Sequence, residues 1–152
     1  MFNSLEDIYY CIAQNIINAL PDEWEHAYLD VIVYEVDHSL AMGGVYTYRG
    51  EEIFFDVECV DGVKIITNTD KAFFELYKNM QVNSSDKPWN KCRFELECDG
   101  EFDLKFKFDY DFDWYNGLGC DSADFEMLSY EVIELIESWE GLPTDFNRFW
   151  VK

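Results

Sequence analysis

The sequence predicts an α+β fold. We expect a single domain over residues 1–152, with an antiparallel sheet of about five to six strands and an N-terminal, a middle and a C-terminal helix. Two observations support this. Apolar residues recur with a helical period in three separate segments, and between these segments the period shortens to two. Helices that do not alternate with strands favour an antiparallel sheet over a doubly wound one.

The first helix is predicted over residues 4–20. Its apolar side chains have the spacing of one helix face: Leu5, Ile8, Ile12, Ile16 and Leu20. Ser4 is a suitable N-cap, and Asp7 completes a variant of the capping box. Pro21 ends the helix, because proline cannot continue the backbone hydrogen-bond ladder.

Strands are expected next, in segments rich in Val, Ile, Tyr and Phe. These segments are residues 27–36, 44–49 and 51–60, followed by the short run 63–66. Glycines at 43, 44 and 50 separate the first three segments, and Asp61-Gly62 predicts a turn before the fourth.

Two more helices follow from apolar spacing. Residues 69–81 form the middle helix, with Phe73, Leu76, Tyr77 and Met80 on one face. The C-terminal helix is predicted over residues 123–139 and ends before Gly141 and Pro143. Its apolar stripe is Phe125, Leu128, Val132, Leu135, Ile136 and Trp139.

The clearest strand signal is a hairpin. Residues 92–98 form one arm, Asp99-Gly100 the turn, and residues 102–114 the other arm, in which apolar and polar residues alternate. This pattern predicts that Cys92 and Cys98 face the core. The polar face of the second arm would hold Asp109, Asp111 and Asp113, and we expect Asp111 and Asp113 to tolerate replacement by lysine without loss of the fold.

The charge is strongly acidic. The chain has 32 acidic and 11 basic residues, a formal net charge of -21. Such a field repels nucleic acid and anionic membranes and attracts basic proteins. No lysine or arginine lies between residues 108 and 147, a stretch that holds eleven acids. We interpret this acidic block as an interface for a cationic protein partner, with solubility as the alternative explanation.

Catalytic and metal sites are not indicated. An EF-hand loop that began at Asp109 would need Gly at position 114 and Glu at 120, where the chain has Trp114 and Cys120. Neither histidine has ligand spacing, and the chain lacks a Walker A or G-x-G-x-x-G pattern. We therefore predict no metal, no cofactor and no catalytic residue.

The expected location is the cytoplasm. The N-terminus has no basic region followed by an apolar one, and no apolar run reaches the roughly 20 residues that a membrane span needs. Five scattered cysteines without a C-x-x-C pair fit free thiols in a reducing compartment.

Several segments resemble YezG-type immunity proteins. They are Ile-Ala-Gln-Asn-Ile-Ile at 12–17, Leu-Pro-Asp-Glu-Trp at 20–24, Lys-Pro-Trp-Asn-Lys at 87–91, and the runs 94–102 and 106–111. The resemblance covers residues 5 to about 115. It implies a non-enzymatic antitoxin encoded beside a polymorphic toxin of a contact-dependent or secreted system, often a nuclease.

The functional hypothesis is an immunity protein that binds the basic C-terminal domain of its cognate toxin one to one. The expected toxin-binding residues are Asp109, Asp111, Asp113, Trp114, Tyr115, Asp121, Asp124, Glu126, Glu131 and Glu134. One alternative is a DNA mimic or regulatory module that binds several DNA-binding proteins. Another is an enzyme with an unrecognised carboxylate or thiol site.

Overall fold

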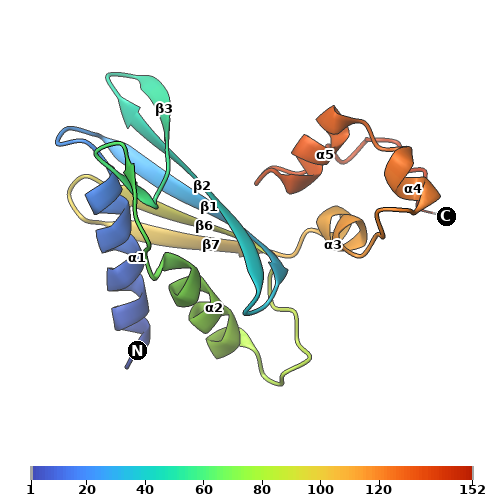
Figure 1. Ribbon diagram of the computed structural model, residues 1–152, viewed down its shortest axis with the longest axis horizontal. Helices are drawn as coiled ribbons and strands as arrows, with labels where there is room; N and C mark the ends of the chain where they lie inside the picture. Colours follow the sequence, from blue (N-terminus) through green and yellow to red (C-terminus); the bar gives the residue numbers. More distant parts are fainter. Residues whose placement is uncertain (1, 152) are drawn as a thin grey trace.

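A computed structural model of the chain describes residues 2–151 (Figure 1). Five antiparallel strands form the main sheet in the order β3-β2-β1-β6-β7. They are β1 (His26–Glu35), β2 (Ser39–Tyr48), β3 (Glu51–Phe55), β6 (Lys91–Glu97) and β7 (Phe102–Lys107). A small hairpin, β4 (Cys59–Val60) with β5 (Val63–Lys64), stands apart from it. The α+β fold class is confirmed.

Two helices, α1 (Leu5–Ala19) and α2 (Thr69–Met80), cover one face of this sheet (Figure 1). The predicted cap of α1 is present, because the Ser4 hydroxyl accepts the N–H of Asp7 at 3.2 Å. The centre of the predicted apolar stripe is correct, since Ile8, Ile12 and Ile16 are all buried, whereas Leu5 at its start is exposed. They pack with alternate residues of the sheet: Ala27, Leu29 and Val31 of β1, and Cys92, Phe94 and Leu96 of β6.

The prediction that Gly43 and Gly44 separate the first two strands was wrong. Gly43 and Gly44 lie inside β2, which begins at Ser39. Gly44 is paired with Phe55 of β3, and a Cβ atom on Gly44 would lie 2.5 Å from the Phe55 ring. The glycine is therefore needed so that an aromatic ring can cross the backbone, a role that a sequence pattern cannot distinguish from a turn.

The Asp61-Gly62 turn is confirmed. Val60 pairs with Val63, and both turn residues have positive φ, 52° for Asp61 and 78° for Gly62, as a type I′ hairpin requires. The predicted strand over residues 51–60 is divided, because β3 ends at Phe55 and β4 begins only at Cys59.

The last third of the chain forms three short helices instead of one long one: α3 (Tyr110–Asn116), α4 (Ala123–Glu126) and α5 (Tyr130–Glu137). The helix predicted over residues 123–139 was wrong in its continuity. The Ser129 hydroxyl accepts the N–H of Val132 at 3.2 Å and so starts α5 as a new helix. Serine competes in this way with helix continuation.

Helices α3 and α5, together with the segment that follows α5, build a second, smaller core. Phe112, Ile136 and Leu142 are buried together, with Ile32 and Tyr34 of β1 packed against them. Ile32 and Tyr34 alternate with Val31 and Val33, which belong to the first core. The C-terminal half of β1 therefore contacts apolar clusters on both faces, in agreement with its nearly continuous apolar sequence.

Candidate functional site

The strand predicted over residues 102–114 was wrong beyond Lys107, where the chain turns into α3. Asn90 fixes this turn: its side chain accepts the N–H of Asp109 at 2.8 Å and donates to the Asp109 carbonyl at 2.9 Å. Asp109 then caps α3 by accepting the N–H of Phe112 at 3.1 Å. The helix buries Phe112 completely, so the three aspartates do not share one strand face. The prediction that Cys98 faces the core was wrong as well. Cys98 is exposed, because β6 ends at Glu97.

Each of these three aspartates is paired with a cation of the same chain. Asp109 binds Lys91 at 2.6 Å, Asp111 binds Arg148 at 2.8 Å, and Asp113 lies 3.4 Å from Lys87. The first two pairs are largely or mostly buried, whereas the third is exposed to solvent. Asp109 and Asp111 therefore hold the molecule together and do not offer a free negative charge to a partner.

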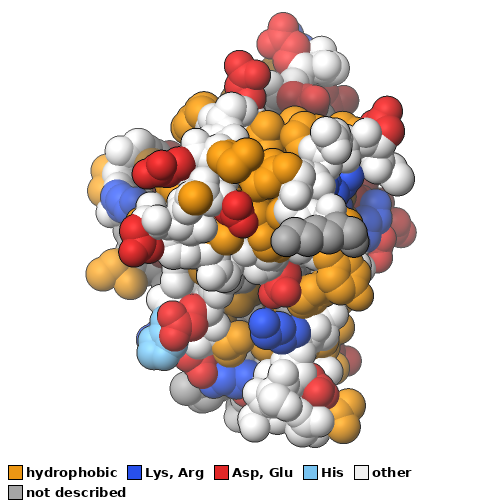
Figure 2. Space-filling view, turned by 90° about the vertical axis from the view of Figure 1, so that its right-hand side faces the viewer, with side chains coloured by type: hydrophobic (Ala, Val, Ile, Leu, Met, Phe, Trp, Pro, Cys, Tyr) orange, Lys and Arg blue, Asp and Glu red, His pale blue; other side chains and the backbone are white. Residues whose placement is uncertain are grey.

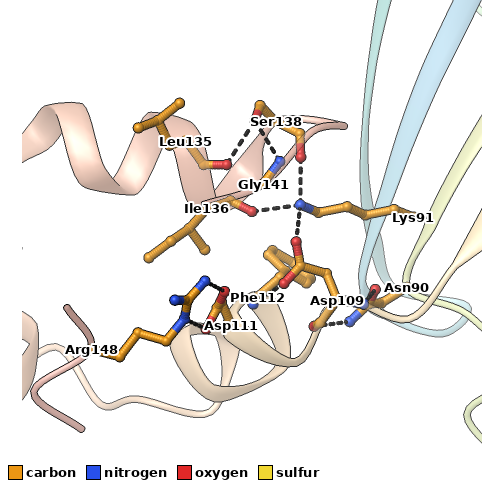
Figure 3. Close-up of polar contacts among 10 residues, drawn as sticks. All are labelled: Asn90, Lys91, Asp109, Asp111, Phe112, Leu135, Ile136, Ser138, Gly141 and Arg148. Atoms are coloured by element: carbon orange, nitrogen blue, oxygen red, sulfur yellow. Dashed lines mark hydrogen bonds and ion pairs between the residues drawn. The ribbon is translucent and has the colours of Figure 1, made fainter. Parts of the chain in front are cut away.

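The Lys91 pair fastens the C-terminal region to the sheet (Figure 3). The Lys91 side chain is 1% exposed, and its ammonium group donates to the Ile136 carbonyl at 2.7 Å and to the Ser138 carbonyl. These carbonyls lie at the C-terminal end of α5, where a helix favours a positive charge and α5 has no basic residue of its own. Gly141 closes over the pair, since a Cβ there would lie 2.6 Å from the Asp109 carboxylate.

The predicted aromatic anchors are engaged inside the molecule. Trp114 stacks on Trp150, with ring centroids 4.0 Å apart, and Tyr115 stacks on Phe125 at 6.1 Å. Arg148 holds the segment that carries Trp150, because its guanidinium forms two hydrogen bonds with Asp111, at 2.8 and 2.9 Å. Trp114 and Tyr115 remain partly exposed at the edge of this packing.

The other predicted acids lie together on and beside α4 and α5. Asp121, Glu126, Glu131 and Glu134 are exposed, and Asp124 is half-buried. Within residues 2–151 none of the five is in an ion pair. Their negative charge, unlike that of Asp109 and Asp111, is available to a partner.

Two large apolar side chains lie between these acids in the sequence and are exposed. Met127 is 63% and Tyr130 75% exposed, and a hydrogen bond to Glu134 raises the pKa of the Tyr130 phenol. Figure 2 shows this side of the molecule, where apolar side chains gather and acidic ones lie around their edge. We call Asp121, Glu126, Met127, Tyr130, Glu131 and Glu134 the acidic helix surface.

The outer face of the sheet has its own cation cluster. Arg93 lies 5.3 Å and Lys107 4.4 Å from the ring of Trp139. Burial, together with the charge of nearby Lys91, lowers the pKa of Lys107. A groove of about 390 Å³ lies between Trp139 and the strands, but the charges that line it are largely satisfied, since Arg93 binds Asp30 at 2.6 Å.

A second hollow, of about 240 Å³, lies where β1, α2 and α3 approach one another. Aromatic side chains from four parts of the chain line it: Tyr34, Tyr77, Trp89, Phe108 and Phe112. Sequence reasoning missed this hollow, because it treated Phe108 and Phe112 as part of a continuous strand. The Lys-Pro-Trp-Asn-Lys segment at 87–91 was the available indication of this hollow, because it places the aromatic Trp89 between polar residues.

Candidate metal ligands and the Cys92 thiol were the remaining chemical groups of interest. Throughout the described residues, no three His, Cys, Asp or Glu side chains are arranged to hold a metal ion. Burial raises the pKa of the Cys92 thiol, so this cysteine is not a nucleophile at neutral pH. In the part of the chain that the structure describes, no helix has the length and apolar character of a membrane span.

Comparison with known proteins identifies the family. No curated protein matches the chain. A model described as "Immunity protein YezG-like" matches residues 5–136, which include the sheet, α1 to α4 and nearly all of α5. The match extends past the resemblance noted above and covers the acidic helix surface. The chain therefore belongs to the YezG-like immunity protein family.

Proposed function

We propose that this protein neutralises a cognate toxin by covering a basic domain of that toxin with its acidic helix surface. Membership in an immunity protein family supports a toxin partner and an inhibitory, non-enzymatic role. The proposed complex contains one copy of each protein. It forms in the cytoplasm, where it protects the producing cell and its siblings from toxin delivered by contact or secretion.

One observation carries this proposal: within residues 2–151 the acids of the acidic helix surface form no ion pair, and Met127 and Tyr130, which lie between them in the sequence, are exposed. An apolar centre with a charged rim is the usual arrangement of a protein interface. Repulsion among the acids destabilises the free protein, and a cationic partner would relieve it. The surface thus has both an apolar contact and an electrostatic reason to bind.

We propose a nuclease as the toxin. A nuclease must bind phosphates and therefore presents lysine and arginine side chains. Opposite fields would accelerate association toward about 10⁸–10⁹ M⁻¹s⁻¹ at low salt. A fast association rate matters for an inhibitor that has to bind before the toxin cuts. We accordingly expect the association rate to fall steeply as salt is raised.

The test is binding to the toxin domain encoded beside the gene. The variant Glu131→Lys/Glu134→Lys reverses two charges on the acidic helix surface. We expect at least about a tenfold loss of affinity, because like charges would then face each other. The matched control is Glu101→Lys/Asp103→Lys, which makes the same charge change at the far end of the β6–β7 hairpin.

The outcomes separate the candidates. Equal weakening by both double variants would mean that net charge alone acts, and no weakening by either would exclude the acidic helix surface. Killing by the toxin despite coexpression of the folded protein would contradict the immunity role itself. Capture of many unrelated DNA-binding proteins, with no preference for the adjacent toxin, would favour a DNA mimic instead.

A further inference from the structure

The hollow of about 240 Å³ beside α3 has the size and lining of a site for a single long side chain. Five aromatic residues line it: Tyr34 and Phe108 are partly exposed and form its walls, whereas Tyr77, Trp89 and Phe112 are buried behind them. Aromatic rings attract cations electrostatically, and they exclude water from what they enclose. A hollow of this kind is where a partner's anchoring residue inserts in many protein complexes.

The charges at the hollow are mainly negative. Glu35 and Asp113 both line it, and their side chains are 72% and 42% exposed. Lys87 is the one cation in the described lining. Its ammonium group is 3.4 Å from the Asp113 carboxylate, and its side chain is 66% exposed. An ion pair so open to water contributes at most about 1 kcal/mol, so another cation can displace it.

The chain contains an internal precedent for such an arrangement. The Arg93 guanidinium lies 4.0 Å from the centroid of the Tyr28 ring. The same guanidinium donates two hydrogen bonds to Asp30, at 2.6 and 2.8 Å. A planar guanidinium can lay its face on a ring while its edge donates two hydrogen bonds to a carboxylate, a geometry that a lysine ammonium group does not have.

We propose that this hollow receives an arginine side chain of the toxin partner, with the guanidinium against the aromatic walls and in contact with Asp113 in place of Lys87. This inference rests on the proposed function and adds an anchoring contact to it. It also places Phe108 and Asp113, which are both partly exposed, in the interface through a pocket instead of a strand face.

A probe without toxin tests the pocket directly. N-acetyl-arginine N-methylamide is titrated into the intact protein, and chemical shifts are followed by NMR. The buried indole N–H of Trp89, which has no hydrogen-bond partner in the structure, is a reporter inside the lining. N-acetyl-norleucine N-methylamide serves as the uncharged probe, and sulfate tests for anion binding at Lys87.

We expect saturable shifts with the arginine probe and much weaker ones with norleucine. Asp113→Asn should weaken binding about threefold to thirtyfold, the range of a cation contact at a partly buried site. Lys87→Ala should strengthen binding, because it frees Asp113 from its internal partner. Asp103→Asn is the matched control, an exposed acid outside the hollow and outside the acidic helix surface that should leave binding unchanged.

Three results would overturn the inference: no saturable shift with any probe, equal binding of the norleucine probe, or sulfate binding that Lys87→Ala abolishes. Circular dichroism of each variant shows whether the fold is retained. Because no toxin is used, a negative result here leaves the proposed immunity role standing. A failed toxin complex, in turn, leaves the arginine affinity of the pocket measurable.

Discussion

Lys91→Met should destabilise the protein more than any surface charge change, by about 3–5 kcal/mol of unfolding free energy. Methionine preserves the volume of the lysine stem but removes the ammonium group. The Asp109 carboxylate, only 10% exposed, would lose the cation at 2.6 Å. The carbonyls of Ile136 and Ser138 would lose a charged donor as well, and each unsatisfied group adds about 1–3 kcal/mol where it stays buried.

The partner variant in a double-mutant cycle is Asp109→Asn. Asparagine is also a good N-cap, so the hydrogen bond to the Phe112 N–H can persist while the charge is removed. We expect the double variant to be more stable than the sum of the single changes predicts, by at least about 1 kcal/mol, because it has no orphaned buried charge. Urea unfolding followed by tryptophan fluorescence measures all four proteins.

Hydrogen exchange adds a spatial readout. If Lys91 fastens α5 to the sheet, amides of α5 should lose protection in Lys91→Met before those of β1 do. A Lys91→Met protein within about 1 kcal/mol of wild type, at an unchanged m-value, would refute this reasoning. So would a cycle that is additive within about 0.5 kcal/mol.

Two further predictions concern the thiols and Asp111. Cys98 and Cys120 should react quickly with a thiol reagent at neutral pH. Cys92 should react only on unfolding, because burial raises the pKa of its thiol and excludes the reagent. Fast modification of Cys92 in the native protein would contradict its burial in the core. Asp111→Lys should cost about 3 kcal/mol and weaken the near-ultraviolet signal of the Trp114–Trp150 stack, since Arg148 then loses its partner. Asp113→Lys, at an exposed pair, should cost less than about 1 kcal/mol, and equal losses for the two variants would argue against the tail contact.

Local patterns in the sequence were sufficient where neighbouring residues determine the conformation. Ser4 caps the first helix through an N–H only three residues away, and its apolar stripe is set by helical spacing. The turn at Asp61-Gly62 needs two residues that tolerate positive φ, and Asp and Gly are residue types that do so. The family could likewise be recognised from short segments distributed along the chain.

The error at residues 108–114 shows what such patterns lack. Alternation of apolar and polar residues is compatible with a strand and also with a short helix that has one buried side chain. The helix is favoured here by Asn90, which lies nineteen positions before Asp109 in the sequence and holds the Asp109 backbone by two hydrogen bonds. Because of this long-range contact, Phe112 became core and Asp109 became a cap.

The sequence alone therefore determined the fold class, the strong acidic charge and the family, since composition and local spacing do not depend on which distant residues meet. Only the tertiary structure decided which acidic side chains pair with a cation of the same chain. Asp109 and Asp111 are paired with Lys91 and Arg148, while Glu131 and Glu134 have no ion-pair partner in the part of the chain that the structure describes. The physical reason is that a charge is neutralised by proximity in space, and proximity between distant parts of a chain arises only when it folds.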